Sequence, residues 1–475
     1  MEIKEKIIKD LDRIINEYIK AEFVPGLAVG VVYNNEVIYT KGFGVKNIDT
    51  KEPVDENSLF HMASVSKTFV ATGIMQLVEQ GKINLDKCLI EYLPYFKLKD
   101  ERYKNITIRQ ILNHTSGMPD EEDYEWDKPK YDDKALERYV RSVDGRELMW
   151  EPGEKFAYSN IAYEILGHVI EKVSGMSFEE YMKENILDVV KMKESNFLKP
   201  LVSKDLLTSP HILDVKNGYG ATVSEVFPYN RAHGPSSTLC SNVVEMCNYA
   251  IANINEGRFQ GDKILKNTSY SELWREYAST EWGGYTSKIG LSWFLGQYKG
   301  NKVMSHSGMD TGFRSNLIIL PERGIAVVVM INAYYIGTKI LCTSILDILL
   351  GEEVHYIKTS LAQHIIRTMF NNNSEIALKE YDKIKQNSIE RYLVYEDEFN
   401  AIAYQLLERK RVKEAIDVLK ISIEIFKESA NLYDSLGEMY LCEGNKKLAL
   451  ESYKKSVELD PNNENGKKMI EELSV

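Results

Sequence analysis

The first twenty residues place apolar side chains at helical spacing, with charged residues between them. The apolar positions are Ile3, Ile7, Leu11, Ile14 and Tyr18. This period predicts an amphipathic helix over about residues 1–20. Because Lys, Asp and Glu interrupt the apolar positions, we expect no signal peptide. We also expect no membrane span, since no run of about 18 apolar residues occurs in the chain.

Strand-like patterns occur in two separated parts of the chain. Residues 27–45 are rich in Val, Ile and Tyr and contain Asn34-Asn35, which predicts a β-hairpin. Between about residues 64 and 285 the pattern is mainly helical, with long loops. Strand signals return at 290–332 and predict two more hairpins: 291–297 with 302–307 around Lys299-Gly300-Asn301, and 316–320 with 325–331 around Pro321-Glu322-Arg323-Gly324.

Strands at both ends with helices between them predict an α+β fold. We expect one antiparallel sheet built from both strand segments and flanked by helices, with the middle of the chain inserted as a helical lobe. A cleft between the sheet and the lobe is a natural place for a site. We assign residues 1–352 to this domain.

The chain beyond residue 352 has a fully helical pattern with an internal repeat. Within residues 430–461, eight residues fall at the positions typical of the 34-residue tetratricopeptide repeat: Tyr433, Leu436, Gly437, Tyr440, Gly444, Ala449, Tyr453 and Pro461. Six residues at corresponding positions precede them by one repeat: Phe399, Ile402, Ala403, Leu406, Ala415 and Leu419.

We therefore predict a helical tetratricopeptide-like module over residues 353–475. The alternative is an ordinary helical hairpin with a Gly and a Pro. Two clear repeats fall short of the usual three. Residues 360–395 would supply a degenerate helical pair, or the repeats would pack on the first domain.

Composition and charge narrow the function classes. The 475 residues include 59 basic and 71 acidic side chains, a net charge of −12, so we expect no nucleic-acid partner. The five cysteines are scattered and form no C-x-x-C pair, which disfavours a zinc site and a disulfide framework. We predict a cytoplasmic, reduced protein that needs no metal and no cofactor.

The first candidate for chemistry is Ser64-Val65-Ser66-Lys67, at the start of an apolar helical run. A serine hydroxyl needs activation to act as a nucleophile. A lysine three residues further on lies on the same helix face, within reach of the serine oxygen. The spacing alone is not specific, because Ser452 and Lys455 show it inside the repeat, where a solvated face is expected.

The second candidate is Tyr158-Ser159-Asn160, just before an apolar helical run. Ser159 or Asn160 is expected to cap that helix. Tyr158 would act as a general base and acid, but a free tyrosine has a pKa of about 10. We expect the Lys67 ammonium to favour the phenolate and so to lower the pKa of Tyr158.

The third candidate is His306-Ser307-Gly308, at the end of a predicted strand. It is either an edge-strand histidine before a glycine turn, or a cleft wall on which His306 and Ser307 touch the substrate. Gly308 would allow a substrate backbone to approach closely. The N–H of Met309 would join that of Ser64 as an oxyanion hole.

In this order the three motifs resemble the serine β-lactamase and penicillin-binding protein superfamily, in its class C β-lactamase and D,D-peptidase branch. The resemblance covers residues 5–350 and implies the sheet-and-lobe fold reached above. Four flanking segments support it: Pro25-Gly26-Leu27-Ala28, residues 112–118 (LNHTSGM), residues 152–160 (PGEKFAYSN) and Gly312-Phe313-Arg314-Ser315.

The resemblance implies a role for each motif residue. Ser64 would be acylated, and either Lys67 or Tyr158 would take its proton. Tyr158 would also protonate the leaving group and later help to activate water. Asn160 would bind the substrate amide and orient Lys67. We expect His114, in one of the flanking segments, to brace a turn through hydrogen bonds.

One residue departs from the class C pattern, because His306 stands where those β-lactamases have lysine. A histidine near its usual pKa is mostly neutral at pH 7, which weakens the case for antibiotic hydrolysis. Arg314 is a nearby source of positive charge. If His306 bound a substrate anion as imidazolium, activity on anionic substrates would fall as the pH rises past about 6.5.

We therefore predict a serine hydrolase that forms an acyl-enzyme on an amide or ester, most simply a D-amino-acid peptide. The substrate would be a small molecule or a short peptide. The alternatives are a carboxylesterase or β-lactamase of the same family, and a catalytically silent protein that recruits a partner through its repeats. A protein partner on the C-terminal repeats is compatible with either activity or silence.

Overall fold

The computed structural model describes residues 2–121, 123–215 and 220–474, which fold into two compact units. The first unit comprises residues up to Arg13, Val24–Ile212 and Val223–Val354. The second comprises Ile14–Phe23, Leu213–Thr222 and the chain from His355 onward. Helix α1 (Glu2–Glu22) confirms the predicted N-terminal helix, and its residues are divided between the two units.

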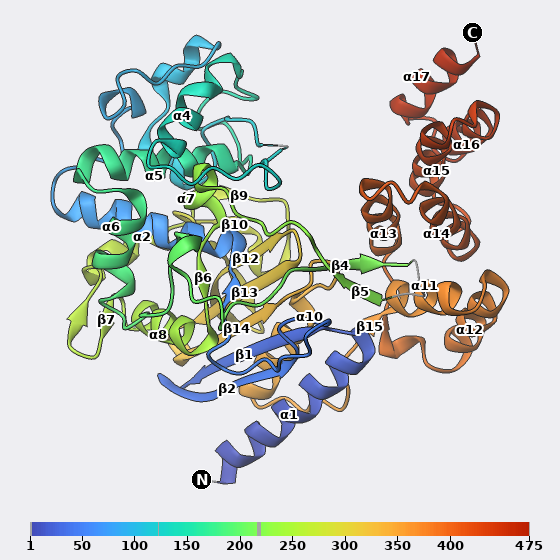
Figure 1. Cartoon of the computed structure of the whole chain (residues 1–475), viewed down its shortest axis with the longest axis horizontal. Coiled ribbons are helices and arrows are strands. Elements are labelled where there is room, and N and C mark those ends of the chain that lie inside the picture. The colour runs from blue at the N-terminus through green and yellow to red at the C-terminus, as the bar shows by residue number, and fades with distance from the viewer. Residues whose placement is uncertain (1, 122, 216–219, 475) are drawn as a thin grey trace. The chain divides into compact units, whose positions relative to one another are not determined.

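An eight-stranded antiparallel sheet is the framework of the first unit (Figure 1). Its order is β2-β1-β14-β13-β12-β11-β10-β9. Strand β1 pairs with β14, so the two ends of the domain close into one sheet, as the sequence predicted. The bounds are β1 Gly26–Tyr33, β2 Glu36–Gly44, β9 Ala278–Ser279, β10 Lys288–Ile289, β11 Phe294–Tyr298, β12 Asn301–Asp310, β13 Phe313–Leu320 and β14 Ile325–Ile331.

All three predicted hairpins are present in this sheet. Asn34 and Asn35 make the turn between β1 and β2 with φ angles of 52° and 62°. Positive φ at both central residues is the type I′ geometry that fits the twist of paired strands. The sequence did not single out the β9 and β10 strands, because two-residue strands carry no readable alternation.

Helices gather to one side of the sheet as the predicted lobe (Figure 1). Helix α8 lies against β1 and β14, and α10 lies against β13 and β14. The helices of this unit are α2 Ser66–Glu79, α3 Ile108–Leu112, α4 Ala135–Ser142, α5 Asn160–Ser174, α6 Phe178–Met182, α7 Gly234–Ser237, α8 Val243–Ile254, α9 Asn267–Leu273 and α10 Lys339–Leu349. The α+β class is thereby confirmed.

Short strand pairs lie outside the main sheet. One of them joins β3 (Phe60–His61) to β6 (Cys240–Ser241), directly before the Ser64 motif. The others are β4 (His211–Asp214) with β5 (Gly220–Val223), β7 (Arg258–Phe259) with β8 (Asp262–Lys263), and the parallel pair β15 (Thr359–Ser360) with β16 (Tyr392–Leu393).

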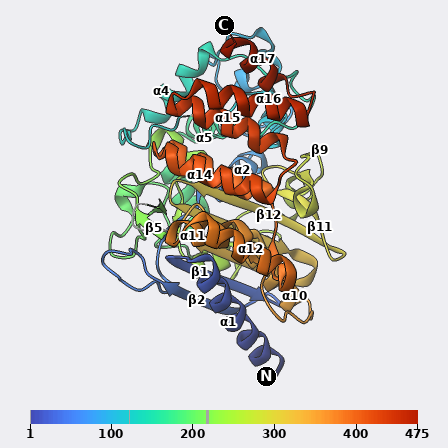
Figure 2. The same cartoon turned by 90° about the vertical axis from the view of Figure 1, so that its right-hand side faces the viewer.

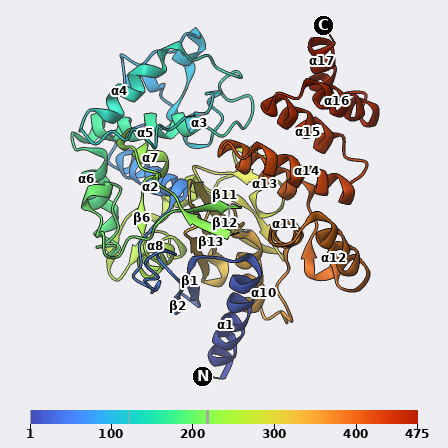
Figure 3. The ribbon, with the colours of Figure 1, turned by 45° about the vertical axis from the view of Figure 1, so that its right-hand side comes forward.

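The C-terminal part of the second unit is helical, and most of its successive helices are in contact (Figures 2 and 3). Its helices are α11 Leu361–Asn371, α12 Ser374–Asn387, α13 Glu396–Glu408, α14 Val412–Ile425, α15 Ala430–Glu443, α16 Lys446–Leu459 and α17 Glu464–Leu473. Gly437 allows close packing of α15 on α16, because a methyl group there would lie 2.9 Å from the Tyr453 ring.

Candidate active site

Ser64 and Lys67 lie where the chain enters α2. Ser64 belongs to a short 3₁₀ turn (Ala63–Val65), and Lys67 is in the first turn of the helix. The Lys67 side chain is fully buried, and its Nζ donates to Ser64 Oγ at 3.0 Å. The helix period thus brings this nucleophile candidate and this amine together, as the spacing predicted.

The Lys67 ammonium has three acceptors. Besides Ser64 Oγ, Nζ donates to Asn160 Oδ1 at 2.6 Å and to the Ser236 carbonyl at 2.8 Å. An ammonium has three N–H groups, so these contacts satisfy it completely. A neutral amine that keeps the Asn160 and Ser236 contacts would direct its lone pair at Ser64. The arrangement suits proton transfer from the serine hydroxyl to the lysine.

Tyr158 lies beside the pair, with its ring centre 5.1 Å from Lys67 Nζ. Burial raises the pKa of Tyr158 well above its usual value, and a hydrogen bond with Ser64 opposes the rise. This overturns the expectation that Lys67 lowers the pKa of Tyr158. Burial lowers the pKa of Lys67 to about 8, so the lysine is the better proton acceptor near neutral pH.

His114 braces Tyr158 from behind. Its ring stacks on the Tyr158 ring with centres 4.4 Å apart, and its Nδ1 accepts a hydrogen bond from the Ser159 backbone at 3.2 Å. The predicted bracing role of His114 is confirmed. Ser159 begins α5 as its N-cap, as expected, by accepting from the Ala162 N–H at 3.2 Å.

His306 lies on β12 with its side chain buried and its ring centre 6.5 Å from that of Tyr158. Its Nδ1 contacts the Ser307 carbonyl at 2.8 Å, which places the ring proton on Nδ1. Burial, helped by the charge of Lys67, lowers the pKa of His306 to about 3. His306 is therefore neutral at physiological pH, and the expected fall in activity above pH 6.5 has no charged imidazole to produce it.

The rest of the third motif is arranged by strand alternation. The side chains of Ser307 and Met309 are exposed, whereas Gly308 faces the Ser64 turn. A methyl group on Gly308 would lie 2.3 Å from the Met62 carbonyl oxygen, so glycine is required for this close approach. We expected Ser307 to share a cleft wall with His306, but the alternation places the two side chains on opposite faces.

The edge of β12 is open beside the motif. The pairing of β11 with β12 ends at Ser305, whereas β13 continues to pair with β12 as far as Asp310. Backbone groups on an open strand edge are available to an extended ligand.

Three carboxylates that the sequence did not single out surround Lys67. Asp120 accepts from the Asn160 side-chain amide at 3.1 Å, and Asp310 accepts from His61 Nε2 at 2.7 Å. Glu164 lies one turn after Asn160 on α5 and is fully buried. The i to i+4 spacing from Asn160 was the one available signal for Glu164, because acidic side chains on a helix are usually exposed.

An aromatic cluster borders Tyr158 on another side. Phe156 and Phe294 contact Trp282, with ring centres 5.4 Å and 4.8 Å apart, and Trp282 is 5.8 Å from Tyr158. Trp282 remains 52% exposed. An exposed aromatic side chain next to a candidate catalytic residue offers an apolar contact for a substrate.

Within residues 2–121, 123–215 and 220–474, no cluster of three or more His, Cys, Asp or Glu side chains has the arrangement of a metal site. Over the same residues, no helix has the length and apolar character needed to cross a membrane.

The sequence profile of the family described as Beta-lactamase matches residues 11–339. The chain therefore belongs to the β-lactamase and penicillin-binding protein superfamily, a serine-hydrolase type of family. Among curated relatives it is similar to Protein flp of Staphylococcus aureus strain MW2, with 26% identity over 326 residues. That match covers 68% of this chain and 63% of flp, so the chain spans less than two thirds of that relative.

Two further likenesses agree with this placement. Beta-lactamase-like protein 2 of Dictyostelium discoideum is 27% identical over 327 residues, covering 66% of this chain and 57% of that protein. The octameric penicillin-binding protein homologue from Pyrococcus abyssi superposes with a TM-score of 0.66 and 26% identity, covering 76% of this chain and 81% of that one. The β-lactamase-like fold predicted from the three motifs is thus confirmed.

Proposed function

We propose that the chain is a serine hydrolase that forms an acyl-enzyme on Ser64. The observation that carries this proposal is the buried Lys67 amine, 3.0 Å from Ser64 Oγ and held by two further acceptors. A nucleophile that is hydrogen-bonded to a base, which a third group orients, is the general signature of nucleophilic catalysis.

The acylation step follows from these contacts. Neutral Lys67 takes the Ser64 hydroxyl proton while Ser64 Oγ bonds to the substrate carbonyl carbon, whose oxygen becomes an oxyanion. The backbone N–H groups of Ser64 and Met309 stabilise that oxyanion. As the C–N or C–O bond breaks, the proton held by Lys67 passes through the Tyr158 hydroxyl to the leaving group. A tyrosine with a raised pKa suits this relay, because it stays protonated.

Deacylation repeats these transfers with water. The proton of the attacking water passes through the Tyr158 hydroxyl to neutral Lys67 as the water oxygen bonds to the acyl carbon. Lys67 then returns a proton to Ser64 Oγ as the bond between Ser64 and the acyl carbon breaks. Asn160 is assigned to the substrate amide and to the orientation of Lys67. Ser307 and Gly308 are assigned to backbone contact with the substrate.

We favour a D-amino-acid peptide as the substrate class. His306 is neutral, and Asp120 and Asp310 both raise the pKa values of neighbouring groups in the site. A site with more acidic than basic charge favours a neutral group or an amine next to the scissile bond over a free carboxylate. Arg314 is already engaged, because its Nε donates to the Tyr334 carbonyl at 2.7 Å. The charges of the site favour an aminopeptidase-like reaction over a D,D-peptidase reaction, with an esterase as the alternative.

The test combines covalent labelling with a substrate panel. The protein is incubated with a fluorophosphonate and with a fluorescent penicillin, and intact mass and peptide mapping locate any adduct. D-amino-acid amides, a D-Ala-D-Ala peptide, nitrophenyl esters and a cephalosporin are then compared, with Ser64→Ala as the control. We expect labelling at Ser64 and the fastest turnover with the amides or esters. An unlabelled Ser64 and no turnover of any substrate would show a catalytically silent protein.

For the C-terminal region, we propose that residues 353–475 form a tetratricopeptide-like module separate from the hydrolase domain of residues 1–352. The support is the run of helical pairs α13 with α14 and α15 with α16, the second of which packs through Gly437 and Tyr453. Such repeats bind a peptide or a protein partner on a concave face. Deletion of residues 380–475 tests what the module does. Unchanged turnover and melting temperature would favour partner binding as its role. A fall in both would indicate that the module stabilises the hydrolase domain.

A further inference from the structure

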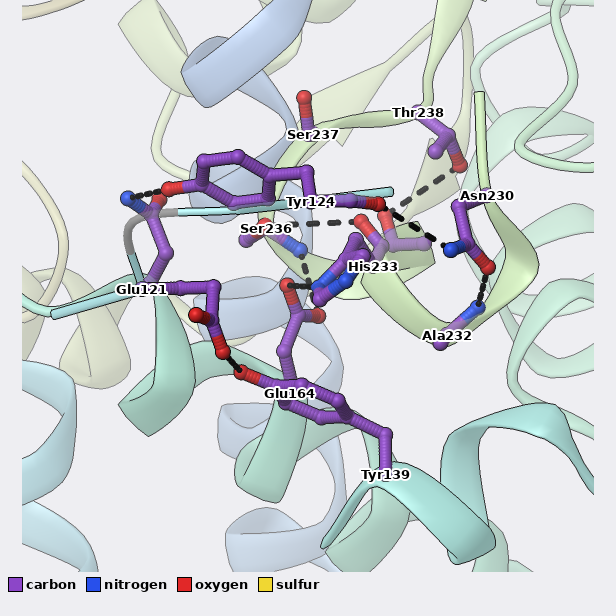
Figure 4. A network of polar contacts seen from close by, with 12 residues as sticks. Glu121, Tyr124, Tyr139, Glu164, Asn230, Ala232, His233, Ser236, Ser237 and Thr238 are labelled. Carbon is purple, nitrogen blue, oxygen red and sulfur yellow. Dashed lines mark hydrogen bonds and ion pairs between the residues drawn. The ribbon is translucent and has the colours of Figure 1, made fainter. Parts of the chain in front are cut away.

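Glu164 is a buried carboxylate behind the candidate site, and the proposed function gives it no role. Its Oε2 accepts a hydrogen bond from the Ser236 backbone N–H at 3.2 Å, and its Oε1 lies 3.4 Å from His233 Nδ1. Figure 4 shows the carboxylate between Ser236 and the His233 ring. The side chains of Glu164 and His233 are 0% and 3% exposed. A fully buried carboxylate is costly to a fold, so its position calls for a physical reason.

The contacts of Lys67 supply that reason. Two of its acceptors, Asn160 and Ser236, each contact a carboxylate in turn. The Asn160 amide donates to Asp120 at 3.1 Å, and the Ser236 N–H donates to Glu164 at 3.2 Å. Lys67 is thus held between Asn160 and Ser236, and each of these residues is oriented by a carboxylate of its own. Asp120 is partly exposed, whereas water does not reach Glu164.

His233 is enclosed by three aromatic rings. The rings of Tyr124, Trp126 and Tyr139 meet its imidazole edge to face, at centre distances of 5.1, 5.7 and 4.6 Å. Tyr139 in turn donates to Glu121 at 2.6 Å (Figure 4). Glu121 also accepts from Arg146 at 3.0 Å. Glu121 therefore pairs with the Arg146 guanidinium. Glu164 instead lies next to the His233 ring and is connected to Lys67 through Ser236.

Several titratable groups face Lys67 from the elements packed around it. They are Asp120 and His114 from the loops after α3, Tyr158 just before α5, Tyr163 and Glu164 within α5, and His306 and Asp310 on β12. Among the carboxylates, Glu164 exerts the largest Coulombic effect on the pKa of Lys67. A charge in a low-dielectric interior acts more strongly than one near water.

We propose that Glu164 is a positioning residue, which holds Lys67 in its charged resting form and fixes the Ser236 carbonyl that orients the amine, with His233 as its buried partner. Burial favours the neutral form of Lys67. Glu164 opposes this and keeps proton release within the physiological range. The inference rests on the proposed function, in which Lys67 takes the Ser64 proton.

The first experiment measures the titration of Lys67 without using activity. Lysine labelled with ¹³C at Cε is incorporated into the full chain, the Lys67 signal is assigned with Lys67→Arg, and the pH titration is followed by NMR. Glu164→Gln keeps an acceptor for Ser236 but removes the charge, so Lys67 should lose its proton at a pH lower by one unit or more. Glu121→Gln is the matched control, and it should leave the Lys67 titration unchanged.

A second, more conservative variant provides the test if the first one misfolds. Glu164→Asp keeps the charge but withdraws it, so Lys67 should shift in the same direction by less. If Glu164→Gln does not fold, this smaller shift is the deciding result. An identical Lys67 titration in the wild type and in the variant that folds would overturn the inference.

The second experiment separates this inference from the proposed function. The rate of Ser64 labelling by a fluorophosphonate is measured against pH, and its acid limb should move to lower pH in Glu164→Gln by the same amount as the Lys67 titration. A loss of rate that is uniform across pH, with no NMR shift, would mean a purely structural role and would overturn the inference. A shifted Lys67 titration with an unmoved acid limb would support Glu164 and contradict Lys67 as the proton acceptor.

Discussion

The same four-residue spacing, Ser-x-x-Lys, occurs in both units, with opposite outcomes. In the first unit Lys67 is buried, its pKa is lowered to about 8, and it donates to Ser64. In α16 of the second unit, Ser452 donates to the Leu448 carbonyl of its own helix at 2.9 Å, and Lys455 pairs with Glu458 at 2.7 Å. That pairing raises the pKa of Lys455. The spacing brings two side chains to one helix face, but only burial among polar partners gives the lysine a reactive pKa.

The sharpest way to break this comparison is to remove each lysine. We expect Lys67→Met to slow turnover by about 10³-fold, because it removes the proton acceptor from Ser64. Lys455→Met is the matched variant and should leave turnover unchanged. Steady-state kinetics with the best substrate of the panel measures both. Equal activities in the two variants would contradict the role of Lys67.

The second prediction concerns the close approach of β12 to the Ser64 turn. A Cβ on Gly308 would lie 2.3 Å from the Met62 oxygen and 2.5 Å from Ser315 Oγ. We expect Gly308→Ala to displace the strand and reduce kcat/KM by about 10²-fold. Gly337→Ala is the control, because a methyl group there meets nothing within 4 Å. Normal kinetics in Gly308→Ala would show that the approach is not needed.

In the second unit, we expect the close approach at Gly437 to affect stability alone. A methyl group on Gly437 would lie 2.9 Å from the Tyr453 ring, which is buried between α15 and α16. We expect Gly437→Val to destabilise this region by about 2 kcal/mol, measured by urea unfolding followed by circular dichroism. Turnover should not change, and a loss of turnover without any loss of stability would argue against a separate module.

The fourth prediction uses the pKa of His306, which burial lowers to about 3. Between pH 6.5 and about 3 the unfolded chain binds a proton at this residue and the folded chain does not, so folding stability falls as the pH falls through this range. His306→Gln should therefore lose less stability than the wild type between pH 7 and 4.5, by about 2 kcal/mol. Chemical denaturation at the two pH values provides the measurement; parallel losses would mean that His306 is protonated in the fold.

The smallest expected effect concerns the exposed aromatic residue near Tyr158. Trp282→Ala should raise KM by a few-fold for substrates with an apolar side chain, with kcat nearly unchanged, because it removes ground-state contact. Leu201→Ala, which truncates another exposed apolar side chain, is the control. A change confined to kcat would instead indicate that Trp282 positions the Tyr158 side chain.

The sequence was informative wherever local chemistry decides structure. Asn34 and Asn35 predicted a hairpin turn because few other residues accept positive φ, and Ser159 predicted a helix start because its hydroxyl satisfies a free N–H. The strand-like segments at both ends of the domain also predicted that β1 and β14 share a sheet. For the turn and the helix start, a few neighbouring residues contain the whole cause.

The sequence could not predict the properties of the site that depend on burial. Neither the raised pKa of Tyr158 nor the importance of Glu164 can be found from a motif, because both depend on water being excluded by distant segments. The Lys67 charge was expected to dominate Tyr158, but the desolvation of the phenolate outweighs it. A carboxylate on a helix looks the same in sequence whether it faces water or a buried lysine.

Ala63, the residue before the candidate nucleophile, has a further consequence. Its φ is 47°, a left-handed conformation that costs a residue with a β-carbon about 1 kcal/mol. Its methyl group also occupies the narrow gap that a Cβ on Gly308 would enter, at 3.0 Å. In evolutionary terms, we expect position 63 to tolerate few substitutions. A larger side chain would not fit, and glycine would relax the backbone but leave the turn less defined. We expect the loops around this turn to tolerate more sequence change, and we expect new substrate specificities in this lineage to arise in those loops.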